Sequence, residues 1–208
     1  PFLRTANKKY KPMNIIPYSE ALPLIQEADI LLFRGKGIIS WLIKRYGSGV
    51  HSHVGIAHWD NGNLQCVEFR EFKGGRSVSL KTQVDNNPFG IDVFRAAKRI
   101  DYEHESHILS DSVKSNITTT MLKFTGLPYG WKNIWKLAKH YVPFFRLEPQ
   151  NIKDNNATKI FVCSTAAAYA YRTSYVDPIP YLADAAVTPA DLARSSLFEY
   201  QFTIQKDW

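Results

Sequence analysis

Cysteine is scarce in this chain: two of its 208 residues are cysteines, Cys66 and Cys163. Two cysteines do not make the disulfide framework that holds small secreted domains together, so a hydrophobic core has to stabilise the fold. With 45% apolar and 13% aromatic residues, the chain is large enough to bury one such core. We therefore expect a single domain over residues 1–208 whose cysteines, where they act chemically, act as thiols.

Long apolar runs are also missing. No run approaches the roughly 20 residues that a membrane-spanning helix needs. The basic stretch Pro1–Asn14 is not followed by the apolar segment of a signal peptide. The sequence as it stands predicts a soluble chain with no transmembrane segment. Its compartment is left open, as is any segment before Pro1, because the first residue is not methionine.

Acidic residues are outnumbered, with 19 Asp and Glu against 26 Lys and Arg, a formal net charge of +7. Such an excess favours anionic partners. The basic residues are scattered along the whole chain, however, and no helix-turn-helix, zinc-finger or RNA-binding motif accompanies them. We therefore expect no nucleic-acid partner.

Strand patterns dominate the first half of the chain and helix patterns the second. Glycine and proline punctuate the strands at turns, as in antiparallel sheets. The predicted strands are 28–33, 53–59, 63–69, 77–80, 91–95 and 199–204. The predicted helices are 38–46, 102–124, 131–141, 161–172 and a short one starting at Thr188-Pro189. This order predicts an α+β fold, an antiparallel sheet packed against helices, with a polar loop at 150–158.

A β-hairpin carries the first chemical signal. Asn61-Gly62 favours a tight type I′ turn, and counting back from it pairs Gly55 with Glu68. His53 and Glu68 then become diagonal neighbours on one face, with the gap at Gly55 between them. A carboxylate that accepts a hydrogen bond from an imidazole fixes its tautomer and stabilises imidazolium, as a catalytic base requires. An ion pair on a half-exposed sheet is the structural alternative.

Cys163 supplies the second signal, because Phe161-Val162-Cys163-Ser164-Thr165 is an apolar entry that leads directly into the helix predicted over 161–172. At a helix N-terminus the macrodipole favours an anion, and a neighbouring imidazolium adds to this. The same place offers free backbone amides to a developing oxyanion. A small buried hydrophobe is the alternative for a cysteine among apolar residues.

Three segments, taken together, resemble the circularly permuted NlpC-like hydrolases, a group that includes the YiiX and YebB type and, more distantly, lecithin retinol acyltransferase. They are Ala28–Phe33, Ser52-His53-Val54-Gly55-Ile56 and Phe161-Val162-Cys163-Ser164. The histidine precedes the cysteine, as in the permuted group, and the layout covers roughly residues 28–204. The resemblance implies a papain-like fold with Cys163 as nucleophile, His53 as base and Glu68 as orienting residue.

Two more residues are candidate substrate or oxyanion contacts. Tyr129 lies in Gly126-Leu127-Pro128-Tyr129, which is similar to the family's Gly-x-x-Tyr segment, and ordinary packing is its alternative role. Ser164 follows the nucleophile.

Two further patterns leave alternatives open. His51 and His53 have the spacing of two zinc ligands on one strand, with Cys66 and Glu68 as further candidates, but nothing in the spacing demands a metal. We expect neither metal nor cofactor. The basic amphipathic pattern of 131–141 is compatible with peripheral membrane contact, and packing on the core is its alternative.

These signals predict a thiol hydrolase that cleaves an amide or an ester through an acyl-enzyme on Cys163. The substrate is left open between peptide, cell-wall peptide, isopeptide and acyl lipid. An acyltransferase or lipid acyl hydrolase could use the same residues. A different class is an inactive binding or structural module of a virion or cell surface.

Overall fold

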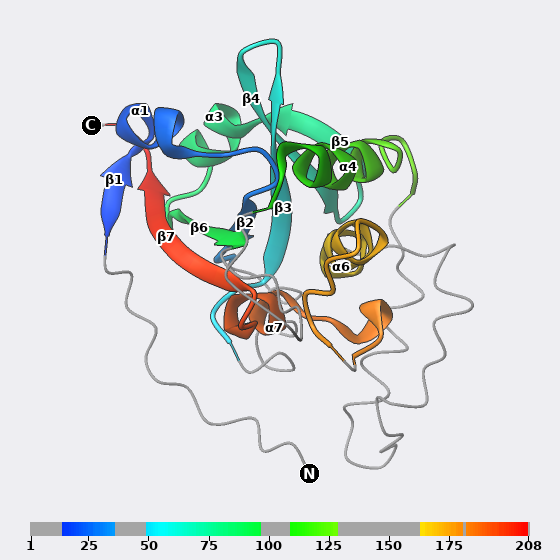
Figure 1. Ribbon diagram of the computed structural model, residues 1–208. Coiled ribbons are helices and arrows are strands. Elements are labelled where there is room, and N and C mark those ends of the chain that lie inside the picture. Colours follow the sequence, from blue (N-terminus) through cyan, green and yellow to red (C-terminus); the bar gives the residue numbers. More distant parts are fainter. Residues whose placement is uncertain (1–13, 36–48, 97–108, 129–162, 181, 208) are drawn as a thin grey trace.

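The computed structural model describes residues 14–35, 49–96, 109–128, 163–180 and 182–207 (Figure 1). The predicted helices 38–46 and 131–141, the predicted loop 150–158 and Tyr129 lie outside the described residues.

The described residues form one seven-stranded sheet in the order β1-β7-β6-β2-β3-β4-β5. Neighbouring strands are antiparallel except β1 and β7, which are parallel. The strands are β1 Ile15–Pro17, β2 Ile30–Phe33, β3 His53–Asp60, β4 Asn63–Arg70, β5 Gly74–Ser79, β6 Ile91–Ala96 and β7 Phe198–Gln205. The mixed α+β architecture agrees with the sequence prediction.

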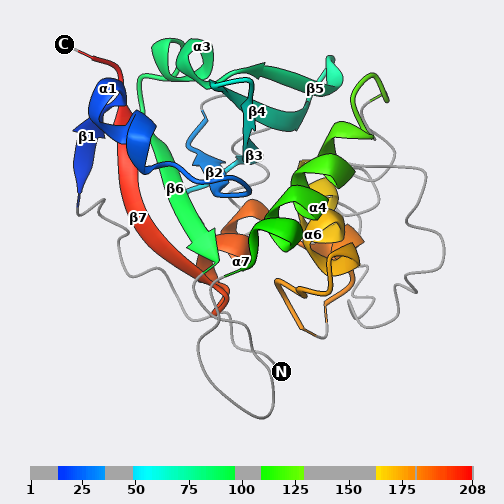
Figure 2. The ribbon, with the colours of Figure 1, turned by 45° about the horizontal axis from the view of Figure 1, so that its top comes forward.

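Helices cover both faces of this sheet. The α-helices are α1 Tyr18–Ala21, α3 Leu80–Asp85, α4 Asp111–Leu122, α6 Cys163–Thr173 and α7 Pro189–Arg194, with 3-10 turns at Leu22–Leu24 and Asp184–Ala186. The alternate residues of each strand form two separate cores. One core packs against α4, α6 and α7, and the other against α1 and α3 (Figures 1 and 2).

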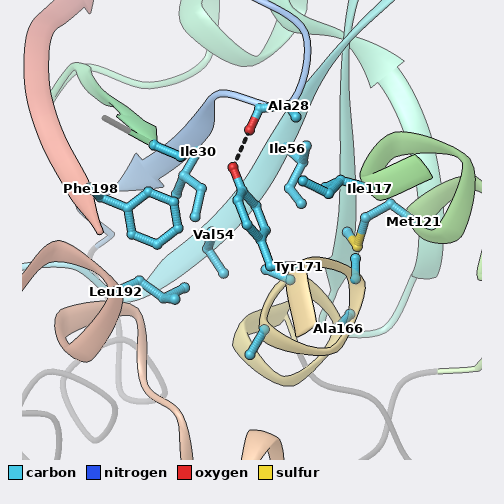
Figure 3. Packing of buried hydrophobic residues seen from close by; sticks show 14 of the residues in the cluster. Ala28, Ile30, Val54, Ile56, Ile117, Met121, Ala166, Tyr171, Leu192 and Phe198 are labelled. Atoms are coloured by element: carbon cyan, nitrogen blue, oxygen red, sulfur yellow. Dashed lines mark hydrogen bonds between the residues drawn. The ribbon is translucent and has the colours of Figure 1, made fainter. Parts of the chain in front are cut away.

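The small side chains of α6 bring that helix close to the sheet. Ala166, Ala167 and Ala170 are fully buried in the first core. Farther along the helix, Tyr171 reaches past Val54 and Ile56, and its hydroxyl donates a hydrogen bond of 2.5 Å to the Ala28 carbonyl (Figure 3). The buried ring of Tyr171 makes apolar contacts, and its hydroxyl has a hydrogen-bond partner. This packing fixes the start of α6, where Cys163 lies, relative to β3.

The β3–β4 hairpin has the predicted turn and register. Asn61 and Gly62 both adopt positive φ, 47° and 80°, as a type I′ turn requires. Asp60 pairs with Asn63, and Gly55 pairs with Glu68. The register is therefore fixed by the turn, and the hydrophobic alternation agrees with it.

Two predicted boundaries are wrong. Leu80 does not end a strand at 77–80: β5 runs earlier, over Gly74–Ser79, and Leu80 starts α3, burying itself with Val84 one helical turn later. Within the described part of the predicted helix 102–124, α4 begins only at Asp111. The reason is Ser110, whose side chain accepts a hydrogen bond from the Val113 amide and caps the helix there.

Candidate active site

His53 and Glu68 form a buried pair at the end of the hairpin opposite to the turn. His53 is the first residue of β3, and its Nε2 lies 2.6 Å from Glu68 Oε2. Glu68 is fully buried and His53 is 5% exposed. The predicted diagonal contact is thus present, and its depth excludes the half-exposed surface ion pair that was the structural alternative.

Gly55 makes room for this contact. A Cβ placed at Gly55 would lie 2.4 Å from Cys66 Sγ and 3.4 Å from Glu68 Cβ. Any side chain here would push against two groups of the neighbouring strand. The absence of a side chain between His53 and Glu68 is therefore what lets the imidazole and the carboxylate meet across the strands.

Two arginines complete the surroundings of Glu68. Arg76 lies directly opposite on β5 and donates from Nε to Oε1 over 2.9 Å. Arg70, two residues farther along β4, brings Nη1 within 3.6 Å of Oε2. Burial by itself raises the pKa of Glu68, but His53, Arg70 and Arg76 outweigh burial and hold that pKa at about 2. Glu68 is therefore a carboxylate at neutral pH.

The charge of His53 follows from the same contacts. Burial lowers the pKa of His53, while Glu68 and the Cys163 sulfur raise it, and the balance places it at about 10. The ring is therefore an imidazolium at neutral pH when its carboxylate and a thiolate flank it. An imidazolium beside a thiol favours the thiolate form of that thiol.

The two ring nitrogens of His53 differ in their contacts. Nε2 is used by Glu68, whereas Nδ1 is buried and has no hydrogen-bond partner among the described residues. Cys163 contributes to the raised pKa of His53, so its sulfur lies near the ring, but no hydrogen bond joins the two side chains. Catalytic hydrogen bonds are often long before substrate binds.

Cys163 is the first residue of α6 and is 2% exposed. The first amides of an α-helix have no acceptor within the helix, so they can donate to an anion placed at its start. A further buried polar atom lies in the first turn of this helix: Thr165 Oγ1 also has no partner within the described part of the chain. Thiol, base and free donors thus gather at one helix terminus.

The hydroxyl of Ser164 has a structural partner, because it donates 2.6 Å to the Val187 carbonyl just before α7. Its backbone amide, in the first turn of α6, is the part of Ser164 that suits the predicted oxyanion contact. Tyr129 lies outside the described residues. The segment before it is held at the edge of the sheet, where Gly75 donates to the Leu127 carbonyl over 2.9 Å.

Two site residues were missed in the sequence, Arg76 and Asp92. Arg76 could have been found by extending the hairpin register to a third strand, which places it across from Glu68. Asp92, on β6, pairs with His51: the His51 Nε2 lies 2.7 Å from Asp92 Oδ2. No local pattern signals that contact, because the two residues are 41 positions apart.

The His51-x-His53 spacing does not produce a metal centre among the described residues. His51 lies before β3, and the Nε2 atoms of the two imidazoles turn to different carboxylates. Within the described ranges, no three His, Cys, Asp or Glu side chains are placed to hold a metal ion. The same ranges contain no helix long and apolar enough to cross a membrane.

Comparison with known proteins gives a fold and no family. No family model matches the sequence, and no curated protein matches it either. Among solved structures, the chain is similar to yiiX from Escherichia coli O157:H7, which is described as a metalloprotein. The similarity has a TM-score of 0.51 at 16% identity, covering 88% of this chain and 98% of the other. The described architecture is therefore that of a YiiX-like α+β fold.

Proposed function

We propose that this protein is a thiol hydrolase that cleaves an amide or ester bond through an acyl-enzyme on Cys163. One observation carries the proposal: the imidazole of His53 is held through Nε2 by Glu68, while its buried Nδ1 has no partner among the described residues and the ring lies near Cys163 at the start of α6. A purely structural histidine is expected to satisfy both ring nitrogens when it is buried.

The reaction follows from the charges. The Cys163 thiolate attacks the substrate carbonyl, and the helix N-terminal amides stabilise the oxyanion that forms. His53 then gives its Nδ1 proton to the departing amine or alcohol as the carbon–heteroatom bond breaks. In the second step neutral His53 takes a proton from water, whose oxygen attacks the thioester, and the thiolate leaves with the acid as product. Glu68 keeps the ring oriented and supports its charged form throughout.

The chain order of these residues supports the papain-like, permuted layout that the sequence resembles. His53 and Glu68 come first, on β3 and β4, and the cysteine helix comes later. The similarity to yiiX supports the coarser statement of a YiiX-like α+β fold. Peptide, cell-wall peptide, isopeptide and acyl-lipid carbonyls all suit this chemistry. Transfer of the acyl group to an amine or alcohol would use the same residues, with the acceptor in the place of water.

Electrophilic probes of peptide, cell-wall and acyl-lipid type, read by mass spectrometry, test the proposal. We expect adducts at Cys163 and none in Cys163→Ala. Offering each acyl donor with and without an amine separates acyl transfer from hydrolysis by product mass. Absence of any adduct and of any turnover would support the inactive binding module.

Cys66 provides the matched control within the same chain. Its thiol is also buried, but burial and the charge of Glu68 raise its pKa well above the ordinary value. Iodoacetamide near neutral pH should therefore label Cys163 faster than Cys66, and Cys66→Ser should leave the Cys163 rate unchanged. Equal labelling, or faster labelling of Cys66, contradicts the assignment of Cys163 as nucleophile.

A further inference from the structure

The two arginines at Glu68 are used differently. Arg76 donates to Oε1 from both Nε and Nη2, and its side chain is 23% exposed. The Arg70 side chain makes no hydrogen bond among the described residues; its 3.6 Å ion pair with Oε2 is too long for one, and the side chain is 38% exposed. Glu68 already has His53 on Oε2, so it needs no second arginine to be satisfied.

Arg70 does not support the charged form of the base directly. Continuing the strand register two residues beyond the Gly55–Glu68 pair brings Arg70 across from His53, on the same face of the hairpin. A fixed positive charge there disfavours imidazolium. An exposed ion pair of this length also adds little to stability. Arg70 does help to lower the pKa of Glu68, but His53 and Arg76, which contact the same carboxylate at hydrogen-bond distance, lower it as well, so this contribution alone does not explain the position of Arg70.

The charge of the site supplies an explanation. Before reaction His53 and Cys163 share one proton, so the two side chains together carry no net charge wherever that proton lies, and Arg70 and Arg76 face the single anion Glu68. After acylation Cys163 is a neutral thioester and His53 has given up its proton, so two cations face one anion. The excess of one positive charge is the same in both states. A single negative charge on the acyl half of the substrate would balance it in both.

We infer that Arg70 binds an anionic group on the acyl portion of the substrate and so determines specificity. This inference rests on the proposed function. Among the described residues no acceptor takes a hydrogen bond from this guanidinium, so its donors can serve a carboxylate or a phosphate, and its planar fork binds either in bidentate fashion. Substrates with a carboxylate or phosphate a short distance from the scissile carbonyl are the class that this residue selects.

Three iodoacetyl probes of similar length test the inference by alkylation of Cys163, with displacement of iodide. They are N-iodoacetylglycinamide, N-iodoacetylglycine and iodoacetylated phosphoethanolamine, which end in an amide, a carboxylate and a phosphate. Each rate is divided by the rate of the same probe with free cysteine. A charge-assisted hydrogen bond corresponds to about a tenfold or greater preference for the better anionic probe over the neutral one.

Arg70→Gln should reduce that preference to near the value set by the imidazolium alone, and Arg70→Lys should retain most of it. Lys206→Gln removes an exposed charge beyond the end of β7 and should change nothing. Thermal unfolding of Arg70→Gln should match that of the parent. Whichever anionic probe is preferred identifies the group as carboxylate or phosphate.

The possible failures are distinguishable. If Cys163 reacts faster than Cys66 with all three probes alike, or if Arg70→Gln keeps the full preference, the role of Arg70 is refuted while the nucleophile stands. If Cys163 reacts no faster than Cys66 with any of them, the proposed function falls and the anion site falls with it.

Discussion

Two histidines separated by one residue each pair with a buried carboxylate, yet we propose only one of the pairs for catalysis. His51 contacts Asp92 and His53 contacts Glu68, through Nε2 in both cases and over 2.7 and 2.6 Å. The difference lies at the other ring nitrogen. Of the two rings, only His53 has a buried nitrogen without a partner among the described residues. The histidine of such a pair becomes a candidate base when its second ring nitrogen has no hydrogen-bond partner.

The two carboxylates, Asp92 and Glu68, also differ in the segments that they hold together. Asp92 ties together three parts of the sheet, accepting from Arg34 after β2, from His51 before β3 and from Thr203 on β7. Glu68 is held by neighbours on the adjoining strands β3 and β5. We therefore interpret the Asp92 cluster as a clamp on the segment that leads into β3, and the Glu68 cluster as the support of the base.

Replacing each histidine by alanine should give the largest difference in turnover between the two pairs. On any substrate found by the probe screen, His53→Ala should lower turnover about a thousandfold, the range of a lost general base. Cys163→Ala should be as severe or worse, since such residues act as a unit. His51→Ala should stay within about tenfold of the parent per folded molecule. A His51→Ala variant as inactive as His53→Ala would overturn the comparison.

Asp92→Asn tests the clamp through stability. Removing one partner of a buried ionic cluster costs about 3–5 kcal/mol, because the remaining charges stay buried without compensation. We expect urea unfolding to show a loss of this size, with Cys163 in the folded fraction still labelled by iodoacetamide. A variant of unchanged stability but lost Cys163 reactivity would instead assign Asp92 to the chemistry.

Glu68→Gln should slow turnover by roughly ten- to a hundredfold, less than His53→Ala, because an amide can orient the ring but supports imidazolium less well. The pH dependence has a definite sign. The pKa of His53 is raised from 6.5 to about 10, so its stabilising contribution is complete below 6.5 and is lost as the pH rises toward 10. The pKa of Glu68 is lowered from 4.5 to about 2, so its contribution is complete above 4.5 and is lost toward pH 2.

Thermal unfolding of the parent and of Glu68→Gln should therefore differ most between about pH 4.5 and 6.5, and the difference should shrink by pH 9.5. Arg70→Gln serves as a control, because it removes a charge near Glu68 while leaving the His53–Glu68 contact in place. A difference that grows with rising pH would contradict the raised pKa of His53.

The sequence was sufficient for the part of the site that depends on one turn. Asn61-Gly62 fixes the hairpin register, and the register alone brings His53 to Glu68. Likewise Thr188 and Pro189 begin a short helix, α7, through a capping box with Asp191. These features are local, so residue identity and spacing determine them.

Other parts depend on contacts between distant segments. Arg76 was missed because β5 begins with Gly74-Gly75, which carry no strand pattern. These glycines are needed where the loop after α4 crosses the strand: a Cβ at Gly74 would lie 2.1 Å from the Leu127 carbonyl oxygen. The approach of Cys163 to His53 depends on how α6 docks on β3, which the alanines permit but do not specify. Contacts of this kind between distant segments cannot be predicted from any single stretch of the sequence.

The smallest effect expected is that of metal removal. The protein as purified should contain no stoichiometric zinc, and chelators should leave the labelling of Cys163 unchanged. The physical reason is again the two pairs: a zinc ion bound through both Nε2 atoms would have to break two buried contacts, and within the described ranges no three His, Cys, Asp or Glu side chains are placed to hold the ion. Elemental analysis before and after chelation measures this directly. Because yiiX is described as a metalloprotein, the result discriminates sharply. One tightly held zinc per chain, lost in both His51→Ala and His53→Ala, would show that the two histidines bind one metal ion. The two pairs would then belong to a single metal site.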